Sequence, residues 1–201
     1  MKITKIEWAG LEAALFGIGL SYGITSGKEI YDVFENPFDP DENETYGKLK
    51  RIASNLCKLG HGEDKFLRQC LYIWDVQAPR FWWSEADTYK LATVAQSEST
   101  MHTIMHRNLV QEDFEYPIHQ NLLDNLNGYI DDYRTNKSEN AFLMLKNELP
   151  EGFLQRRIWS MNLANMKNIV KQRKNHRLPQ WKVVCKAFID ATPDFLKGIY
   201  D

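Results

Sequence analysis

Residues 66–76 form the most strongly patterned stretch of the chain. Apolar side chains alternate there with polar ones, and the apolar set is Cys70, Tyr72, Trp74 and Val76. An alternation of period two that is rich in aromatic side chains is typical of a β-strand. Pro79 is predicted to end this strand, because proline has no N–H for the hydrogen-bond ladder of a sheet. The segment therefore predicts the central strand of a sheet.

Helical patterns dominate most of the remaining sequence. They predict helices over residues 49–60, 80–87, 118–133, 142–149, 158–173 and 181–188. Trp82 and Trp83 are predicted to lie in the core. Residues 1–10 predict a short strand that leads into a helix, and the stretch from Gly27 to Glu44 predicts an exposed loop able to cover a site. The predicted fold class is α+β, mostly helix with a few strands, in a single domain over residues 1–201.

Charge and composition exclude several classes of protein. The 25 lysines and arginines against 27 aspartates and glutamates give a net charge of −2, which argues against a general nucleic-acid binder. No apolar run approaches the roughly 18 to 20 residues that span a bilayer, and no signal-peptide pattern is found. Cys57, Cys70 and Cys185 are too widely spaced to predict a CxxC metal site or a disulfide framework. We therefore expect a cytoplasmic protein without a membrane partner.

A stripe of amides on the predicted helix over residues 158–173 is the first candidate site. It consists of Asn162, Asn165 and Asn168, and it ends in the guanidinium of Arg173. These groups supply donors and acceptors for a nucleotide base, an isoalloxazine ring or a phosphate. The same spacing also fits a solvated helix face or a hydrogen-bonded seam between helices. Spacing alone does not decide between these interpretations.

Two further groups have both a binding and a structural interpretation. His102 and His106 lie four residues apart, but the sequence pattern supplies no further ligands, so we expect no metal site. The basic cluster within residues 171–177 suits either the negative end of a helix dipole or a phosphate. Neither group decides the function.

Several short motifs follow one another in a fixed order between His61 and Trp181. His61 precedes a predicted strand that ends in Ala78-Pro79, and a predicted helix follows. The later motifs are Lys146, Leu149-Pro150, Asn162-x-Ala164-x-x-x-Asn168, Arg173 and Gln180-Trp181. This order and spacing resemble the flavin-dependent thymidylate synthases, the ThyX family, and look closest to the divergent ThyX-like proteins of bacteriophages.

The resemblance implies a twisted β-sheet wrapped by helices, a homotetramer, and FAD and dUMP held between subunits. The implied chemistry is reductive methylation of dUMP by methylenetetrahydrofolate. By position, Asn162 and Asn168 would face the flavin, and Lys146 and Arg173 would face the nucleotide.

The family signature RHRxxSxNxxSxRY is altered in this chain. With Ala78-Pro79 in register, its RHR triplet becomes Thr88-Tyr89-Lys90, and its last four positions become Glu98-x-Thr100-Met101. Only Lys90 keeps the charge class of the arginines that neutralise flavin and nucleotide phosphates in the family. Each lost charge-assisted contact costs about 1.5 to 3 kcal/mol. A shift of one or two residues brings Ser97 or Ser99 to the serine position but restores no arginine.

The sequence therefore predicts a ThyX-fold nucleotide-binding protein without ordinary thymidylate synthase activity. The residues predicted to bind the nucleotide are Lys146, Arg173, Lys90, Gln96 and Ser99. Those predicted at the cofactor position, where the altered signature disfavours FAD, are His61, Tyr89, Asn162 and Asn168. Asp87 and Glu98 are candidates for a changed chemistry. In a phage, such a protein would serve modified-nucleotide metabolism or sequester a host nucleotide.

Two other classes of function stay open. One is an active, divergent FAD-dependent thymidylate synthase or dUMP-modifying enzyme, in which Lys90 and Arg107 hold the phosphates. The other is a protein-interaction module that uses the surface of the oligomer and binds no ligand.

Overall fold

The computed structural model describes residues 1–34, 44–59 and 62–201. These residues form two compact units. Unit 1 comprises Met1–Ile3, Asp75–Leu91 and Ala95–Trp159, and unit 2 comprises Thr4–Trp74, Ala92–Val94 and Ser160–Asp201. The single domain over residues 1–201 stays a prediction.

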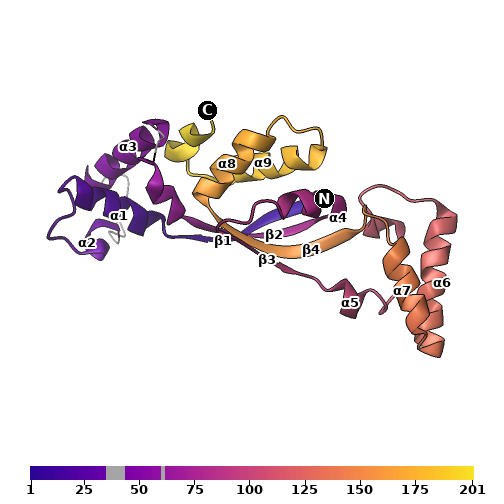
Figure 1. The fold of residues 1–201 in the computed structure, drawn as a ribbon. Helices are drawn as coiled ribbons and strands as arrows, with labels where there is room; N and C mark the ends of the chain where they lie inside the picture. Colours follow the sequence, from indigo (N-terminus) through magenta and orange to yellow (C-terminus); the bar gives the residue numbers. More distant parts are fainter. Residues whose placement is uncertain (35–43, 60–61) are drawn as a thin grey trace. The chain divides into compact units, whose positions relative to one another are not determined.

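The sheet of the described chain has four antiparallel strands in the order β1-β2-β4-β3 (Figure 1). The strands are β1 (Lys2–Ala9), β2 (Leu71–Pro79), β3 (Thr93–Ser97) and β4 (Leu154–Asn162). Together with the helices around them, they confirm the predicted α+β class. The predicted strand at the start of the chain is also confirmed.

Strand β2 has the predicted alternation. Tyr72, Trp74 and Val76 are buried, and the intervening side chains are half-buried. The strand begins at Leu71. Before it, Lys65–Arg68 form the short 3-10 helix η1, in which Phe66 and Leu67 are both buried. Two consecutive buried side chains do not fit the alternating faces of a strand, so the prediction placed the start of this strand too early.

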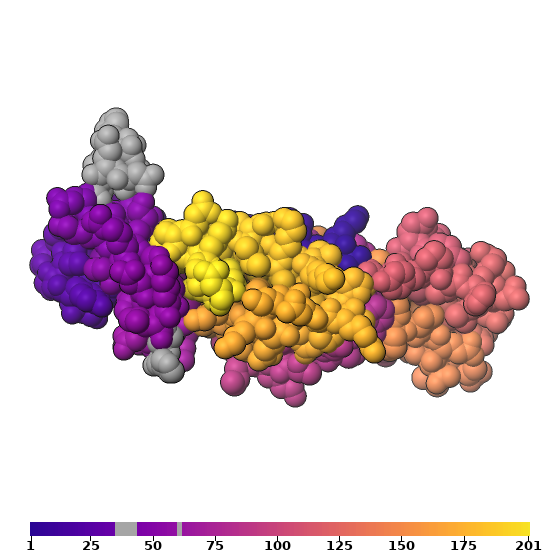
Figure 2. All heavy atoms as spheres, turned by 90° about the horizontal axis from the view of Figure 1, so that it is seen from above, coloured from indigo at the N-terminus to yellow at the C-terminus, as the bar shows by residue number. Residues whose placement is uncertain are grey.

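Unit 1 has a helical hairpin as its main apolar core. Its helices are α4 (Arg80–Ala86), α5 (Thr100–Thr103), α6 (Gln120–Asn136) and α7 (Glu139–Glu148), with the 3-10 helix η2 (Gln111–Asp113). Leu126 and Ile130 of α6 pack with Leu145 of α7, and the two helices lie side by side in both views (Figures 1 and 2). The hairpin turn is short because Lys137 adopts a left-handed conformation and Ser138 caps α7.

Unit 2 contains the remaining helices. They are α1 (Leu11–Ser21), α2 (Ile30–Phe34), α3 (Glu44–Leu59), α8 (Leu163–Arg173) and α9 (Pro179–Ala191), with the 3-10 helices η1 and η3 (Asp194–Tyr200). Helix α8 packs on α9. Phe188 of α9 covers Trp74 of β2, with ring centroids 4.9 Å apart.

Two expectations need correction. The predicted helix over residues 158–173 was wrong in its first part, because residues 158–162 belong to strand β4 and the helix begins at Leu163. Trp159 and Met161 are buried while Ile158 is exposed, so these residues follow the period of a strand. In the predicted loop from Gly27 to Glu44, residues 30–34 form helix α2, and residues 35–43 lie outside the described part. No helix of the described residues is long and apolar enough to traverse a bilayer.

Candidate functional site

The predicted site residues divide between the two units. Tyr89, Lys90, Gln96, Ser99 and Lys146 lie in unit 1. Asn162, Asn168 and Arg173 lie in unit 2, and His61 falls outside the described residues.

In unit 1, Lys146 and the start of helix α5 come together. Lys146 lies in the last turn of α7, and its Nζ donates a hydrogen bond to Oγ1 of Thr100 at 2.5 Å. Ser99, the residue before Thr100, is the N-cap of α5. The ammonium is half-buried, and no carboxylate of the described residues forms an ion pair with it. An unneutralised cation beside hydroxyl groups is a suitable place for an anion.

Arg80 adds a second positive charge near Lys146. Burial, and then the charge of Arg80, lower the pKa of Lys146. Arg80 donates to the carbonyl oxygen of Leu149 at 3.3 Å and pairs with Glu151 at 3.0 Å. Neither Thr100 nor Arg80 was predicted from the sequence as a neighbour of this lysine. Arg80 could have been identified from the sequence, because it directly follows Ala78-Pro79 at the start of a predicted helix.

The other predicted residues of unit 1 follow α4 and run along β3. Tyr89 is half-buried and Lys90 is exposed, in a turn between α4 and β3. Gln96 is exposed within β3. Ser99 thus lies next to the pair of Thr100 and Lys146. Gln96 lies earlier in the chain, in strand β3, and Lys90 lies in the turn before that strand.

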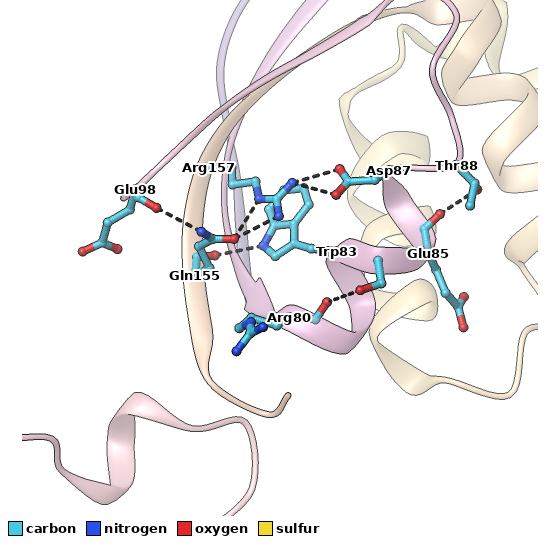
Figure 3. A network of polar contacts seen from close by, with 9 residues as sticks. Arg80, Trp83, Glu85, Asp87, Thr88, Glu98, Gln155 and Arg157 are labelled. Carbon is cyan, nitrogen blue, oxygen red and sulfur yellow. Dashed lines mark hydrogen bonds and ion pairs between the residues drawn. The ribbon is translucent and has the colours of Figure 1, made fainter. Parts of the chain in front are cut away.

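A polar network connects helix α4 with strand β4 (Figure 3). Arg157 binds both carboxylate oxygens of Asp87 at 2.9 and 3.1 Å and donates to Oε1 of Gln155 at 2.9 and 3.1 Å. Its guanidinium lies 4.3 Å from the ring centroid of Trp83. The indole of Trp83 donates to the carbonyl oxygen of Gln155 at 2.9 Å. Asp87 and Arg157 therefore hold α4 on the sheet.

The neighbouring arginines of unit 1 are also paired. Arg156 forms two hydrogen bonds with Asp75 across strands β4 and β2, at 2.5 and 2.8 Å, and they lower the pKa of that carboxyl. Arg107 binds both oxygens of Asp113 at 2.5 and 2.7 Å. Burial raises the pKa of Asp113, but Arg107 and the Val110 N–H outweigh it and lower the pKa overall. Arg107, which the alternative enzyme hypothesis assigns to phosphate, has a carboxylate partner here.

The amide stripe of unit 2 differs from the prediction. Asn162 is the N-cap of α8, and its side chain accepts a hydrogen bond from the N–H of Asn165 at 3.0 Å. It is buried and precedes the helix, so it does not share a helical face with Asn168. Asn168 is exposed and accepts from Gln172 at 3.0 Å. An N-cap asparagine satisfies the first free N–H groups of a helix, and this explains why an amide stands at position 162.

Arg173 lies at the C-terminal end of α8, where its charge suits the helix dipole. Its guanidinium lies 4.9 Å from the ring centroid of Trp181 in α9. Burial raises the pKa of Cys185 to about 11, although the charge of Arg173 opposes this. Lys171 and Arg173 of the predicted basic cluster thus lie in the last turn of a helix, and phosphate binding by this cluster stays a prediction. Arg173 also contributes to the packing of α8 on α9.

Unit 2 also contains a cavity of about 600 Å³. Its walls include Ser21 and Tyr22 from the end of α1, and Glu63, Lys65 and Phe66 from the segment that follows position 61. A cavity of this size is in the range of small-molecule sites. None of the residues that line this cavity was a predicted site residue.

Two solved structures of the flavin-dependent thymidylate synthase ThyX from Helicobacter pylori, both with FAD and dUMP, are similar to this chain. Their TM-scores are 0.70 and 0.69, and each match covers 100% of this chain and 98% of that chain at 14% sequence identity. The chain has the ThyX fold. No protein-family model matches the sequence, and no curated protein matches it. The ThyX fold that the sequence motifs predicted is thus confirmed.

Proposed function

We propose that this ThyX-fold protein binds a pyrimidine nucleotide and that Lys146 contacts its phosphate. The observation that carries the proposal is the unneutralised, half-buried ammonium of Lys146 beside Thr100, in a chain whose structural neighbours contain dUMP. Lys90, Gln96 and Ser99 of unit 1 are further predicted nucleotide contacts, and Arg173 of unit 2 is predicted separately as one.

The surroundings of Lys146 favour a dianion such as a nucleotide phosphate. A bound phosphate would pair with the ammonium and accept hydrogen bonds from the hydroxyls of Ser99 and Thr100. Burial and, to a smaller extent, the charge of Arg80 lower the pKa of Lys146, and a bound phosphate would offset the repulsion between these two cations. Each charge-assisted hydrogen bond of this kind contributes about 1.5 to 3 kcal/mol.

The residues at the signature positions of this chain do not fit the diphosphate of FAD, because they lack most of the basic side chains that the family signature has there. Residues 88–90 supply one cation, Lys90, where the signature has three basic positions. Arg156 and Arg157 of the adjoining strand are paired with Asp75 and Asp87. FAD in the Helicobacter pylori structures nevertheless favours a second candidate function, a divergent flavin-dependent enzyme that acts on dUMP. His61, Tyr89, Asn162 and Asn168 would then be the residues nearest the cofactor.

An absorbance spectrum and a dUMP titration test the proposal. We expect purified protein without the flavin bands at about 370 and 450 nm, and saturable heat on titration with dUMP. Deoxyuridine, which lacks the phosphate, is the matched control and is expected to bind at least tenfold more weakly, because it forms no contact with Lys146. Flavin bands would instead support the enzyme. A colourless protein that releases no heat with dUMP would contradict both and favour a protein-interaction module.

A homotetramer is the assembly that we propose for this protein. In a single copy, the strands of unit 2 expose apolar side chains: Ile6 is 54%, Leu71 53% and Val94 64% exposed. Apolar side chains that form a contiguous exposed patch are typical of surfaces that bind other proteins, and most soluble oligomers are made of identical chains.

The variant Val94→Glu tests this assembly. We expect light scattering to give the wild-type protein a mass about four times 23.5 kDa, and to give Val94→Glu a smaller one, because the new carboxylate would be buried without a partner. Leu143→Glu is the control, because it adds the same charge to a similarly exposed side chain, 62% exposed, that lies on helix α7 and not on a strand. A monomeric wild-type protein would contradict the assembly.

For the biological setting, we propose a cytoplasmic phage protein that supports modified-nucleotide metabolism or sequesters a host nucleotide. Both roles need the nucleotide site, but only a role in metabolism converts the nucleotide into a product. Incubation of dUMP with the protein, followed by mass spectrometry of the nucleotide, separates a binder from an enzyme.

A further inference from the structure

A second group of basic side chains in unit 1 surrounds a cavity of about 390 Å³. His102 and His106 contribute from α5 and the turn that follows it, and Arg134 and Lys137 contribute from the C-terminal end of α6. The size is in the range of sites for small molecules. The nucleotide site proposed above does not use these four residues.

Arg134 is fixed in position by neutral groups. Its Nε donates to the carbonyl oxygen of Met105 and its Nη1 donates to Oδ1 of Asn108, both at 2.8 Å. The nearest carboxylate is that of Asp131, which is exposed and 4.0 Å from Nη1. An exposed ion pair at this distance contributes little, so most of the positive charge of Arg134 stays uncompensated. The two hydrogen bonds hold the guanidinium ready for an anion at low entropic cost.

Lys137 supplies a second full charge at the same cavity. It is the left-handed C-cap of α6, with φ 56°, and its N–H binds the carbonyl oxygen of Tyr133 at 2.9 Å. This backbone position directs the residue to the cavity, and its Nζ lies 5.8 Å from the centroid of the Tyr133 ring. The remaining walls come from Met101 and Met105, so one side of the cavity is apolar.

The residues lining this cavity include no aspartate or glutamate. The positive charges of Arg134 and Lys137 repel a metal ion, although two histidines lie four residues apart at this cavity. They attract a ligand with at least two negative charges, and a diphosphate matches both the charge and the size. We propose that this cavity binds a small diphosphorylated compound, with Arg134 and Lys137 as its main contacts and His102 and His106 as supporting donors.

Titration of the full chain with inorganic pyrophosphate at constant ionic strength tests this site. We expect saturable binding that His102→Gln and Lys137→Gln each weaken about threefold to tenfold and that the double variant weakens further. Both side chains are exposed, so these variants are expected to fold. Lys186→Gln, on the exposed surface of α9, is the matched control for loss of one positive charge and is expected to bind as the wild type does.

Lys146→Met separates this site from the nucleotide site. It is expected to bind pyrophosphate as the wild type does, even though it binds dUMP about tenfold to 150-fold more weakly. Pyrophosphate binding that disappears in Lys146→Met would overturn the proposal, because the anion would then occupy the nucleotide site. Equal affinity of wild type and double variant would also overturn it, as would wild-type affinity no higher than that for sulfate.

Discussion

Replacing Trp83 by alanine is expected to lower the free energy of unfolding by about 3 to 5 kcal/mol. Trp83 is 1% exposed, and its ring packs edge-to-face against Trp82 and Trp159, with centroids 4.8 and 5.9 Å away. The variant would leave a cavity and remove the indole donor to Gln155. It would also remove the ring beneath Arg157. Since domains of this kind are stable by about 5 to 15 kcal/mol, the loss is a large fraction of the total. Urea denaturation measures it.

Two variants make this result specific to the contacts of Trp83. Trp83→Phe keeps an aromatic ring and loses the N–H, so we expect an intermediate loss of about 1 to 3 kcal/mol. Leu91→Ala changes a side chain that is 86% exposed, and we expect a change within about 0.5 kcal/mol. A Trp83→Ala protein as stable as Leu91→Ala would show that the aromatic cluster does not stabilise α4 on the sheet.

The fold was largely predictable because local patterns determine it. The alternation around Trp74 identified β2, and the spacing of Leu126 and Ile130 identified α6. Strand β4 was missed because Ile158 and Met161 are three residues apart, a spacing that suits one face of a helix. In the strand these two residues lie on opposite faces, and the burial of Trp159 and Met161 beside an exposed Ile158 is a property of the folded chain.

The candidate site was predictable in its residues and not in its contacts. Lys146 followed from its spacing to Leu149-Pro150, but its partner Thr100 lies 46 residues earlier in the chain. The pairing of Asp87 with Arg157 likewise spans 70 residues. No periodicity relates such positions, since these pairs depend on which helices and strands become neighbours in the folded chain. The role of Asn162 as a helix cap could not be predicted either, because the sequence did not show that β4 ends at this residue and that α8 begins after it.

Lys146→Met is expected to weaken dUMP binding by about tenfold to 150-fold. Methionine keeps the length of the side chain and removes the charge, so the variant loses one charge-assisted contact worth about 1.5 to 3 kcal/mol. Lys146→Arg keeps the charge and is expected to retain most of the affinity. Calorimetric titration with dUMP measures the difference, and deoxyuridine binding is expected to change little in either variant.

The stability of Lys146→Met distinguishes loss of a ligand contact from damage to the fold. Burial and the charge of Arg80 lower the pKa of Lys146, so its ammonium is less favourable in the folded protein than in the unfolded chain. Removing this charge is therefore expected to leave the melting temperature unchanged or slightly raised below the folded pKa of the lysine. A variant that melts as the wild type does and binds dUMP equally well would contradict a phosphate contact at Lys146. A variant that binds dUMP more weakly by this factor and keeps its stability would assign the ammonium to the ligand, because a structural lysine would affect both quantities.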